Sequence, residues 1–219
     1  MTDVRLNAYT LTSICISVTV LLSSLTFLFS NHYRAFPHFI SEADVGFVPS
    51  LLFKGGFLLS SLAMTWMMSS SAQRLVEQKV GMFFLIVAIS LGIIAVVSLW
   101  LVIIYDLHAN IRMHTIAAGV CFLSSIFWTK VYGTAIGIDS NLYNRGLYIS
   151  AIGCVTMIGA LILAPNYSSR FDTNAYLDSI QHFIVFAAPA EFILVTGLLV
   201  SIYALGNEDG EKNSARVKV

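Results

Sequence analysis

The sequence predicts an all-α, polytopic membrane bundle of six transmembrane helices with both termini in the cytosol. Two observations lead to this fold class. Hydrophobic residues make up 57% of the chain and charged residues only 11%, which is about half the charged share of a typical soluble domain. A soluble domain needs that charge to cover its surface, so most of this surface must face lipid. The apolar residues also fall into six long stretches, and a spanning helix needs about 20 such residues.

The six stretches follow one another through nearly the whole chain. They are Ala8–Ser30, Pro49–Ser71, Val80–Tyr105, Met113–Thr129, Gly146–Ala164 and Phe183–Leu205. The first is too long for the apolar core of a signal peptide and no small-residue cleavage site follows it, so we expect a retained helix. The fourth is the shortest, but the flanking Arg112 and Lys130 can extend their charged ends to the membrane surface. The stretches lack the alternation of polar and apolar residues that β-barrel strands show.

Residues 1–205 are therefore predicted to form one six-helix transmembrane domain. Residues 206–219 are charged and are predicted to be a disordered cytosolic tail. Small residues recur at helix-packing spacing as Gly133/Gly137 and Gly153/Gly159/Ala160. Such residues let helices approach closely, so they predict packing and carry no information on function.

The distribution of lysine and arginine predicts the orientation, because cytosolic loops carry an excess of both. Eight of these residues lie on the side of the two termini: Arg5, Arg74, Lys79, Lys130, Arg145, Lys212, Arg216 and Lys218. The opposite side has three, Arg34, Arg112 and Arg170, when Lys54 is counted as intramembrane. Both termini are therefore expected in the cytosol. The sequon that begins at Asn166 then lies on the non-cytosolic side, in agreement.

Charge and cysteine content exclude several kinds of function. The net charge is zero and there is no basic patch, so we expect no nucleic-acid partner. Cys15, Cys121 and Cys154 all lie inside apolar stretches, which argues against disulfides and against a thiolate metal site. No HExxH spacing is present. We expect neither a metal nor a cofactor.

Polar groups that can carry chemistry gather on the predicted non-cytosolic face. All five histidines lie there: His32, His38, His108, His114 and His182. The same face carries the acidic residues Glu42, Asp44, Asp106, Asp172 and Asp178. Metal binding and general acid–base catalysis both need such groups to converge at a water-accessible surface. The alternative is that interfacial loops are simply where polar residues are tolerated, and the sequence leaves both interpretations open.

Two charged residues lie inside the predicted helices. Glu191 is roughly 12 Å deep in the sixth helix at about 1.5 Å per residue. A carboxylate at such depth costs about 2.5–3.5 kcal/mol on insertion scales, so it should face the bundle interior or a cavity. Lys54 enters the second helix from the same side to a depth of roughly 10 Å, so we predict a Lys54–Glu191 pair. That pair is either structural or part of a binding cavity; a Lys54 that extends to the surface independently of Glu191 is the third alternative.

Three segments carry a resemblance to a known family. The first connection, Pro37–Gly46, is similar to a Pro-x-Ile-Ser-Asp-x-Gly stretch, with one extra residue that leaves open whether Glu42 or Asp44 corresponds to the family acid. The segment His114–Phe122 is similar to a His…Ala…Phe pattern, and Phe186–Phe192 ends in a matching Glu-aromatic pair. On these segments the chain resembles the Frag/DRAM/Sfk family of membrane proteins. That family includes the damage-regulated autophagy modulators and the post-GPI-attachment factor of GPI lipid remodelling.

The resemblance implies a protein that acts on or with membrane lipids, in the Golgi or endolysosomal membrane rather than the plasma membrane. In one reading it remodels the lipid of GPI anchors from the luminal side. His114, Glu42 and Asp44 would then be catalytic, while Glu191 and Lys54 would bind the GPI glycolipid.

In the other reading the chain is a non-enzymatic membrane regulator of the autophagy-modulator or Sfk type, with lipid and membrane-protein partners. The two readings differ in whether the luminal histidine and acidic groups converge on one cavity that opens to the bilayer. Whether the protein is itself an enzyme stays open at this point.

Overall fold

The structure is a computed structural model that describes residues 7–33, 35–165 and 173–217, and all regular secondary structure within these residues is helical. Six helices are long and apolar enough to cross a membrane: α1 (Ala8–Leu28), α2 (Phe47–Glu77), α3 (Met82–Ile104), α4 (Ile111–Ala135), α5 (Asn141–Leu163) and α7 (Gln181–Val217, apolar as far as Asn207). Two short helices, η1 (Ile40–Ala43) and α6 (Thr173–Ser179), lie in the connections. The prediction of an all-α, multi-pass membrane protein is confirmed.

Polar caps begin three of the spanning helices. The side chains of Asn7, Asn110 and Ser140 accept hydrogen bonds of 2.8, 3.2 and 3.1 Å from the backbone N–H groups of Thr10, Met113 and Tyr143. Each bond satisfies an N–H group that has no partner within its own helix. These caps explain why α1, α4 and α5 begin at or just outside the apolar stretches.

Three helices continue beyond the stretches that predicted them. α2 ends at Glu77 rather than Ser71, and α4 ends at Ala135 rather than Thr129. α7 continues to Val217, so the backbone of residues 206–217 is helical where a disordered tail was expected. Extending an existing helix needs no new nucleus, and Glu, Lys, Arg and Gln are good helix formers. Hydropathy therefore locates the membrane-embedded part of a helix and not its end.

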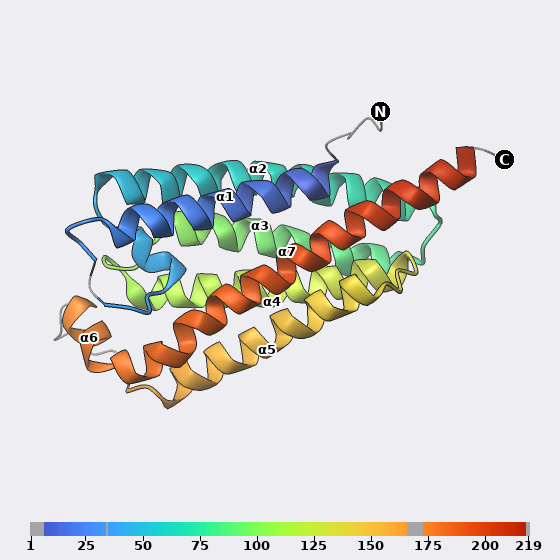
Figure 1. Ribbon diagram of the computed structural model, residues 1–219. Coiled ribbons are helices and arrows are strands. Elements are labelled where there is room, and N and C mark those ends of the chain that lie inside the picture. The colour runs from blue at the N-terminus through green and yellow to red at the C-terminus, as the bar shows by residue number, and fades with distance from the viewer. Residues whose placement is uncertain (1–6, 34, 166–172, 218–219) are drawn as a thin grey trace.

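The helices pack in chain order into a closed bundle. Each spanning helix contacts the next one along the chain, and α7 closes the bundle against α1. α1 begins and α7 ends at the same end of the bundle, here called the terminal end (Figure 1). The opposite end holds η1, α6 and the α3–α4 connection, and is called the η1 end (Figure 1).

The orientation of this bundle in a membrane stays a prediction. The connections α2–α3 and α4–α5 lie at the terminal end, and they contribute to the lysine and arginine excess that marks cytosolic loops. Protease added to sealed vesicles with the cytosolic face outward should therefore digest a tag fused to the C-terminus. A tag that is protected until detergent opens the vesicles would reverse the orientation. Asn166, whose glycosylation would give a second test, lies outside the described residues.

Glycines let α5 and α7 pack backbone against backbone, in the most extensive helix contact of the bundle. A Cβ atom added to Gly153 would lie 2.6 Å from the backbone nitrogen of Leu194. One added to Gly197 would lie 2.7 Å from the carbonyl oxygen of Gly146. Side-chain atoms cannot occupy these positions without moving a helix, so the α5–α7 distance depends on glycine.

Only some of the small residues that were predicted from the sequence to lie at helix contacts do so. Gly153 does, and Gly133 lies against the ring of Tyr143. Gly159 and Gly137 have no described atom within 4 Å of an added Cβ. Gly137 instead has a φ of 67° in the turn after α4, a conformation that favours glycine. Spacing along the sequence therefore identified small residues but not the side of the helix on which a neighbour lies.

Candidate functional site

The connection between α1 and α2 folds back into the η1 end of the bundle instead of covering its surface. Phe39, Ile40 and Ala43 are at most 9% exposed and belong to the hydrophobic core. Burial of these apolar side chains fixes the short helix η1. The same inward fold of the connection buries two acidic residues: Glu42 is 1% exposed and Asp44 is 2% exposed.

Two carboxyl groups are held by adjacent backbone N–H groups at the beginning of η1. The N–H of Ile40 donates to Oε2 of Glu191 at 2.7 Å, and the N–H of Phe39 donates to Oε1 of Glu42 at 3.0 Å. These donors are free because the first N–H groups of a helix lack partners within it. Glu191 therefore joins α7 to η1, and it faces the bundle interior with 5% exposure.

The predicted Lys54–Glu191 pair does not form. The ammonium group of Lys54 lies 3.3 Å from Oδ1 of Asp44 and 3.4 Å from Oδ2 of Asp106. Its side chain is 38% exposed, so it reaches the surface of the η1 end. Both acidic partners lie in connections rather than in helices. Only the depths of Lys54 in α2 and Glu191 in α7 follow from the sequence. These depths could not show that the connections place carboxylates closer to Lys54 than Glu191 is.

Lys54, Asp44 and Asp106 form an ion-pair cluster that ties three parts of the chain together. Asp44 lies after η1, Lys54 in α2 and Asp106 in the α3–α4 connection. Asp44 Oδ1 also accepts a hydrogen bond of 2.6 Å from the Ser50 hydroxyl. Asp106 Oδ1 accepts one of 2.8 Å from the backbone N–H of His108. Since its members are bonded to one another and to the backbone, the cluster fixes loop positions.

The buried carboxyl group of Asp44 should make the stability of the protein depend on pH. Burial raises the pKa of Asp44 above its ordinary value, against the opposing effects of Ser50 and Lys54. A carboxyl with a higher pKa in the folded state binds more protons there than in the unfolded state. Its contribution to stability is therefore complete at acidic pH and is lost as the pH rises through the raised pKa.

We expect Asp44→Asn to flatten this slope in thermal unfolding of the detergent-purified protein between about pH 4 and about pH 8. An identical pH profile in Asp44→Asn and the wild type would show that this carboxyl does not titrate differently on folding.

His114 lies in the first turn of α4 with its imidazole ring buried, at 2% exposure. Its Nδ1 atom is 2.6 Å from the carbonyl oxygen of Tyr105. A carbonyl only accepts hydrogen bonds, so Nδ1 carries the hydrogen and the neutral ring has its lone pair on Nε2. Among the described residues Nε2 has no hydrogen-bond partner. Buried polar atoms without a partner are uncommon, and each one calls for an explanation.

His114 and Glu191 line the same internal cavity. The cavity has a volume of about 90 Å³ and lies between α1, α2, α3, α4, α7 and η1. Ile40 and Ser41 of η1 also contribute to its lining, and the other walls are mostly apolar side chains such as Phe57 and Leu198. Glu191 accepts its hydrogen bond from Ile40 through Oε2, and its Oε1 has no hydrogen-bond partner among the described residues. Two polar groups with unused hydrogen-bonding capacity thus meet one apolar cavity.

The structure divides the predicted site residues into two groups. His114 and Glu191 share the cavity, and Glu42 lies beside Glu191 at η1. Asp44 and Lys54 belong to the ion-pair cluster and do not line the cavity. The sequence placed all five at one end of the bundle, but this division depends on how the η1 connection folds.

The other four histidines do not line the cavity. His38 packs edge-on against Phe27, Tyr33 and Phe192, with ring centroids 5.2 to 6.2 Å apart. His182 is exposed at the beginning of α7. No group of three or more histidine, cysteine or acidic residues that could hold a metal ion occurs in the described part of the chain.

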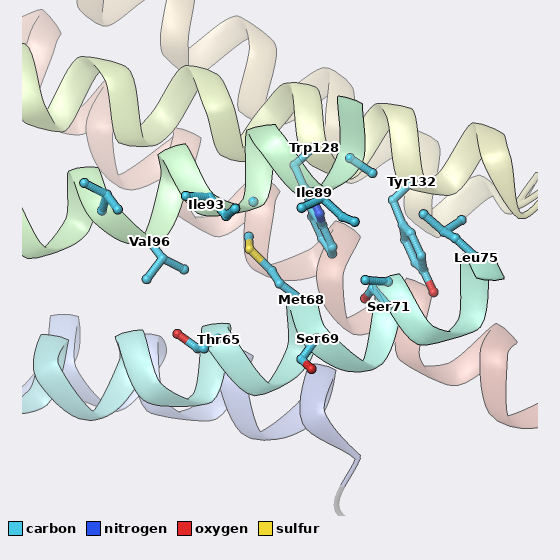
Figure 2. A pocket seen from close by; sticks show the side chains of 14 residues that line it. Thr65, Met68, Ser69, Ser71, Leu75, Ile89, Ile93, Val96, Trp128 and Tyr132 are labelled. Atoms are coloured by element: carbon cyan, nitrogen blue, oxygen red, sulfur yellow. The ribbon is translucent and has the colours of Figure 1, made fainter. Parts of the chain in front are cut away.

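A larger hollow lies elsewhere, between α2 and α3 toward the terminal end. It is a groove of about 310 Å³ with an apolar lining. Figure 2 shows Met68 pointing from α2 toward α3, with Trp128 and Tyr132 reaching between these helices. The rings of Trp128 and Tyr132 are stacked 5.2 Å apart, and the Tyr9 hydroxyl donates to that of Tyr132 at 2.7 Å. None of the predicted site residues lines this groove, so its size does not make it the functional site.

Fold and site together define a multi-pass membrane protein with an internal, mostly apolar cavity that contains one histidine and one carboxyl group. Comparison with protein-family models, with curated proteins and with solved structures finds no match. The resemblance to the Frag/DRAM/Sfk family therefore stays a prediction from three segments of the sequence.

Proposed function

We propose that this protein acts on membrane lipids inside its bundle, and that its activity is the remodelling of GPI-anchor lipids. The observation that carries the proposal is the cavity shared by His114 and Glu191, in which Nε2 of the histidine has no described partner. Apolar walls suit the hydrocarbon part of a lipid, and a few placed polar groups suit its ester or hydroxyl oxygen. The sequence resemblance supports the GPI anchor as the particular substrate.

The size of the cavity narrows what can occupy it. At about 90 Å³, it is well below the roughly 300–1,000 Å³ of sites that enclose a drug-sized ligand. A GPI glycan is larger than a drug-sized ligand, so it would stay outside the cavity. The part that fits is the glycerol region of the lipid or the beginning of an acyl chain, which is the part that a lipid-remodelling reaction changes.

The geometry of His114 fits acyl transfer. With Nδ1–H bonded to the Tyr105 carbonyl, Nε2 can accept the proton of a lipid hydroxyl. The hydroxyl oxygen then bonds to the carbonyl carbon of an acyl ester, the donor's ester C–O bond breaks, and the proton passes from Nε2 to the leaving oxygen. Glu191 would orient the lipid through its available Oε1. Glu42, beside it, would keep η1 and Glu191 in register.

The proposal also implies a location and a partner. The η1 end would face the lumen of the Golgi or of an endolysosomal compartment, where a GPI glycolipid presents its lipid to the membrane interface. The predicted cytosolic position of the termini is consistent with this orientation. The endomembrane location follows from the resemblance and is part of the proposal.

A second candidate function is a non-enzymatic membrane regulator, of the autophagy-modulator or Sfk type. The observation in its favour is the ion-pair cluster of Lys54, Asp44 and Asp106, in which charged groups pair with one another. Charges of this kind satisfy one another, and removing one of them leaves the other unpaired and destabilises the fold, so the cluster can be purely structural. Such a regulator would work through lipid and membrane-protein partners at the η1 end.

The test is the lipid composition of GPI-anchored proteins in cells that lack the chain. Mass spectrometry should show unremodelled GPI lipids in the deletion, and the wild-type chain should restore the remodelled species. His182→Ala changes an exposed histidine and should restore them equally. Unchanged GPI lipids in the deletion, with altered autophagy or membrane signalling, would overturn the remodelling function and favour the regulator.

A further inference from the structure

A groove on the outside of the bundle lies directly beside the internal cavity. It has a volume of about 260 Å³ and runs between α1 and α7. Ser17, Leu21, Ser24 and Leu25 line it from α1, and Phe192 and Thr196 line it from α7. Val20, Val195 and Leu199 also line the groove, and the same three residues line the cavity. These three side chains therefore form the wall between the two spaces.

The surroundings of this groove identify the kind of molecule that meets it. α1 and the part of α7 that lines it both belong to membrane-spanning segments. Leu21 and Leu25 are 59% and 42% exposed, and in a bilayer such side chains face hydrocarbon. An acyl chain of a bilayer lipid is the molecule that can lie along an apolar groove at this depth.

One polar group in the groove lacks a partner. Ser24 is 8% exposed, and its hydroxyl has no hydrogen-bond partner among the described residues. Its neighbours on α1 behave differently, because the hydroxyls of Thr19, Ser23 and Thr26 bond to carbonyl oxygens four residues earlier. Such back-bonding is the usual solution for serine and threonine within a helix. An unsatisfied hydroxyl in hydrocarbon is costly, so Ser24 is available to a ligand.

The position of Ser24 matches the polar end of an acyl chain. Ser24 is four residues before the end of α1 at Leu28, which is about 6 Å at about 1.5 Å per residue. It therefore lies near the η1 end, where the ester carbonyls of a lipid meet the hydrocarbon core. Ser17 and Leu199 lie deeper, toward the middle of the bundle, along the path of the chain.

We infer that the α1–α7 groove seats one acyl chain of a bilayer lipid, with its ester carbonyl accepting a hydrogen bond from Ser24. The wall of Val20, Val195 and Leu199 is the lateral gate through which that lipid reaches His114 and Glu191 from the bilayer. The role of the gate rests on the proposed lipid function of the cavity. The seat itself is a binding property and can be tested without any reaction.

The experiment uses the purified full chain in phosphatidylcholine liposomes that contain a phosphatidylcholine with a diazirine in its acyl chain. After illumination, mass spectrometry maps the labelled residues. Residues 17–25 and 192–199 should be labelled severalfold more than the outer face of α5, where Val155 is 73% exposed. Equal labelling of the two faces would overturn the seat.

Two variants with matched controls test the seat and the gate. Val195→Trp fills the wall and should lower groove labelling severalfold, while Val155→Trp on the outer face of α5 should not. Ser24→Ala should also lower it, and Ser23→Ala, which removes a hydroxyl that is already bonded to the Thr19 carbonyl, should not. Ser24→Ala is a small change, so its labelling can be measured even if Val195→Trp impairs folding. Groove labelling unaffected by both Val195→Trp and Ser24→Ala would refute the inference.

The same labelling separates this inference from the proposed function. Specific groove labelling in a protein whose deletion leaves GPI lipids unchanged would support the seat and reject remodelling. Loss of GPI remodelling in the deletion, with labelling no higher in the groove than on α5, would support the function and reject the lateral route.

Discussion

Replacing His114 by alanine is expected to abolish lipid remodelling while the protein still folds and reaches its membrane. Nε2 of His114 is the buried atom without a described partner that faces the proposed reaction, and no other histidine lines the cavity. Loss of a general base lowers a rate by about 10²- to 10⁴-fold. The lost bond to the Tyr105 carbonyl should cost about 1–3 kcal/mol of stability, which leaves a folded protein to assay.

His182→Ala is the matched control for this prediction, since it removes an exposed histidine from the same end of the bundle. The measurement is the ratio of remodelled to unremodelled GPI lipid, normalised to the amount of folded protein in the membrane. Glu191→Gln keeps an oxygen that can accept the Ile40 N–H, so it should cost little stability. It removes the carboxyl group that is proposed to orient the lipid, so it should reduce activity. Full activity in His114→Ala would remove this residue from the mechanism.

Replacing Gly153 by alanine should destabilise the bundle, whereas the same change at Gly159 should not. Both glycines lie in α5, where alanine is favoured over glycine by about 1 kcal/mol in helix propensity. At Gly153 the added Cβ would lie 2.6 Å from Leu194 N and 2.7 Å from Ala190 O. These are backbone atoms of α7, so they cannot move aside as a flexible side chain can. The strain should outweigh the gain in propensity, with a net loss of about 1–3 kcal/mol.

Gly159→Ala meets no described atom within 4 Å, so only the gain in propensity remains and its stability should equal or exceed that of the wild type. Thermal unfolding of the two variants in detergent, followed by size-exclusion chromatography of the soluble fraction, compares them directly. Equal stability of the two would mean that α5 and α7 do not pack as closely as this structure has them.

The spanning helices were predictable because hydropathy depends on local composition alone. About 20 apolar residues are needed to span a bilayer wherever they occur in the chain, so all six spans were recognised. Helix ends were less predictable, because Glu77 and Ala135 lie in helical turns beyond the apolar stretches that hydropathy detects.

Partners across the bundle were not predictable from the sequence. Glu191 was correctly expected to face the interior, because the cost of a carboxylate in lipid depends only on its depth. Its partner is the backbone N–H of Ile40, a group that every non-proline residue has and that no sequence pattern marks. Lys54 was paired with the wrong residue because helix depth says nothing of where a connection folds.

The proposed lipid remodelling is tested most directly by acyl transfer with the purified chain reconstituted in liposomes. The liposomes would contain a GPI glycolipid with one free glycerol hydroxyl and a phosphatidylcholine with an isotope-labelled acyl chain as the donor. A catalytic role of His114 in acyl transfer predicts that mass spectrometry will detect labelled, diacylated GPI with the wild type and with His182→Ala, and none with His114→Ala. Folded wild-type protein that transfers no acyl chain under these conditions would contradict it.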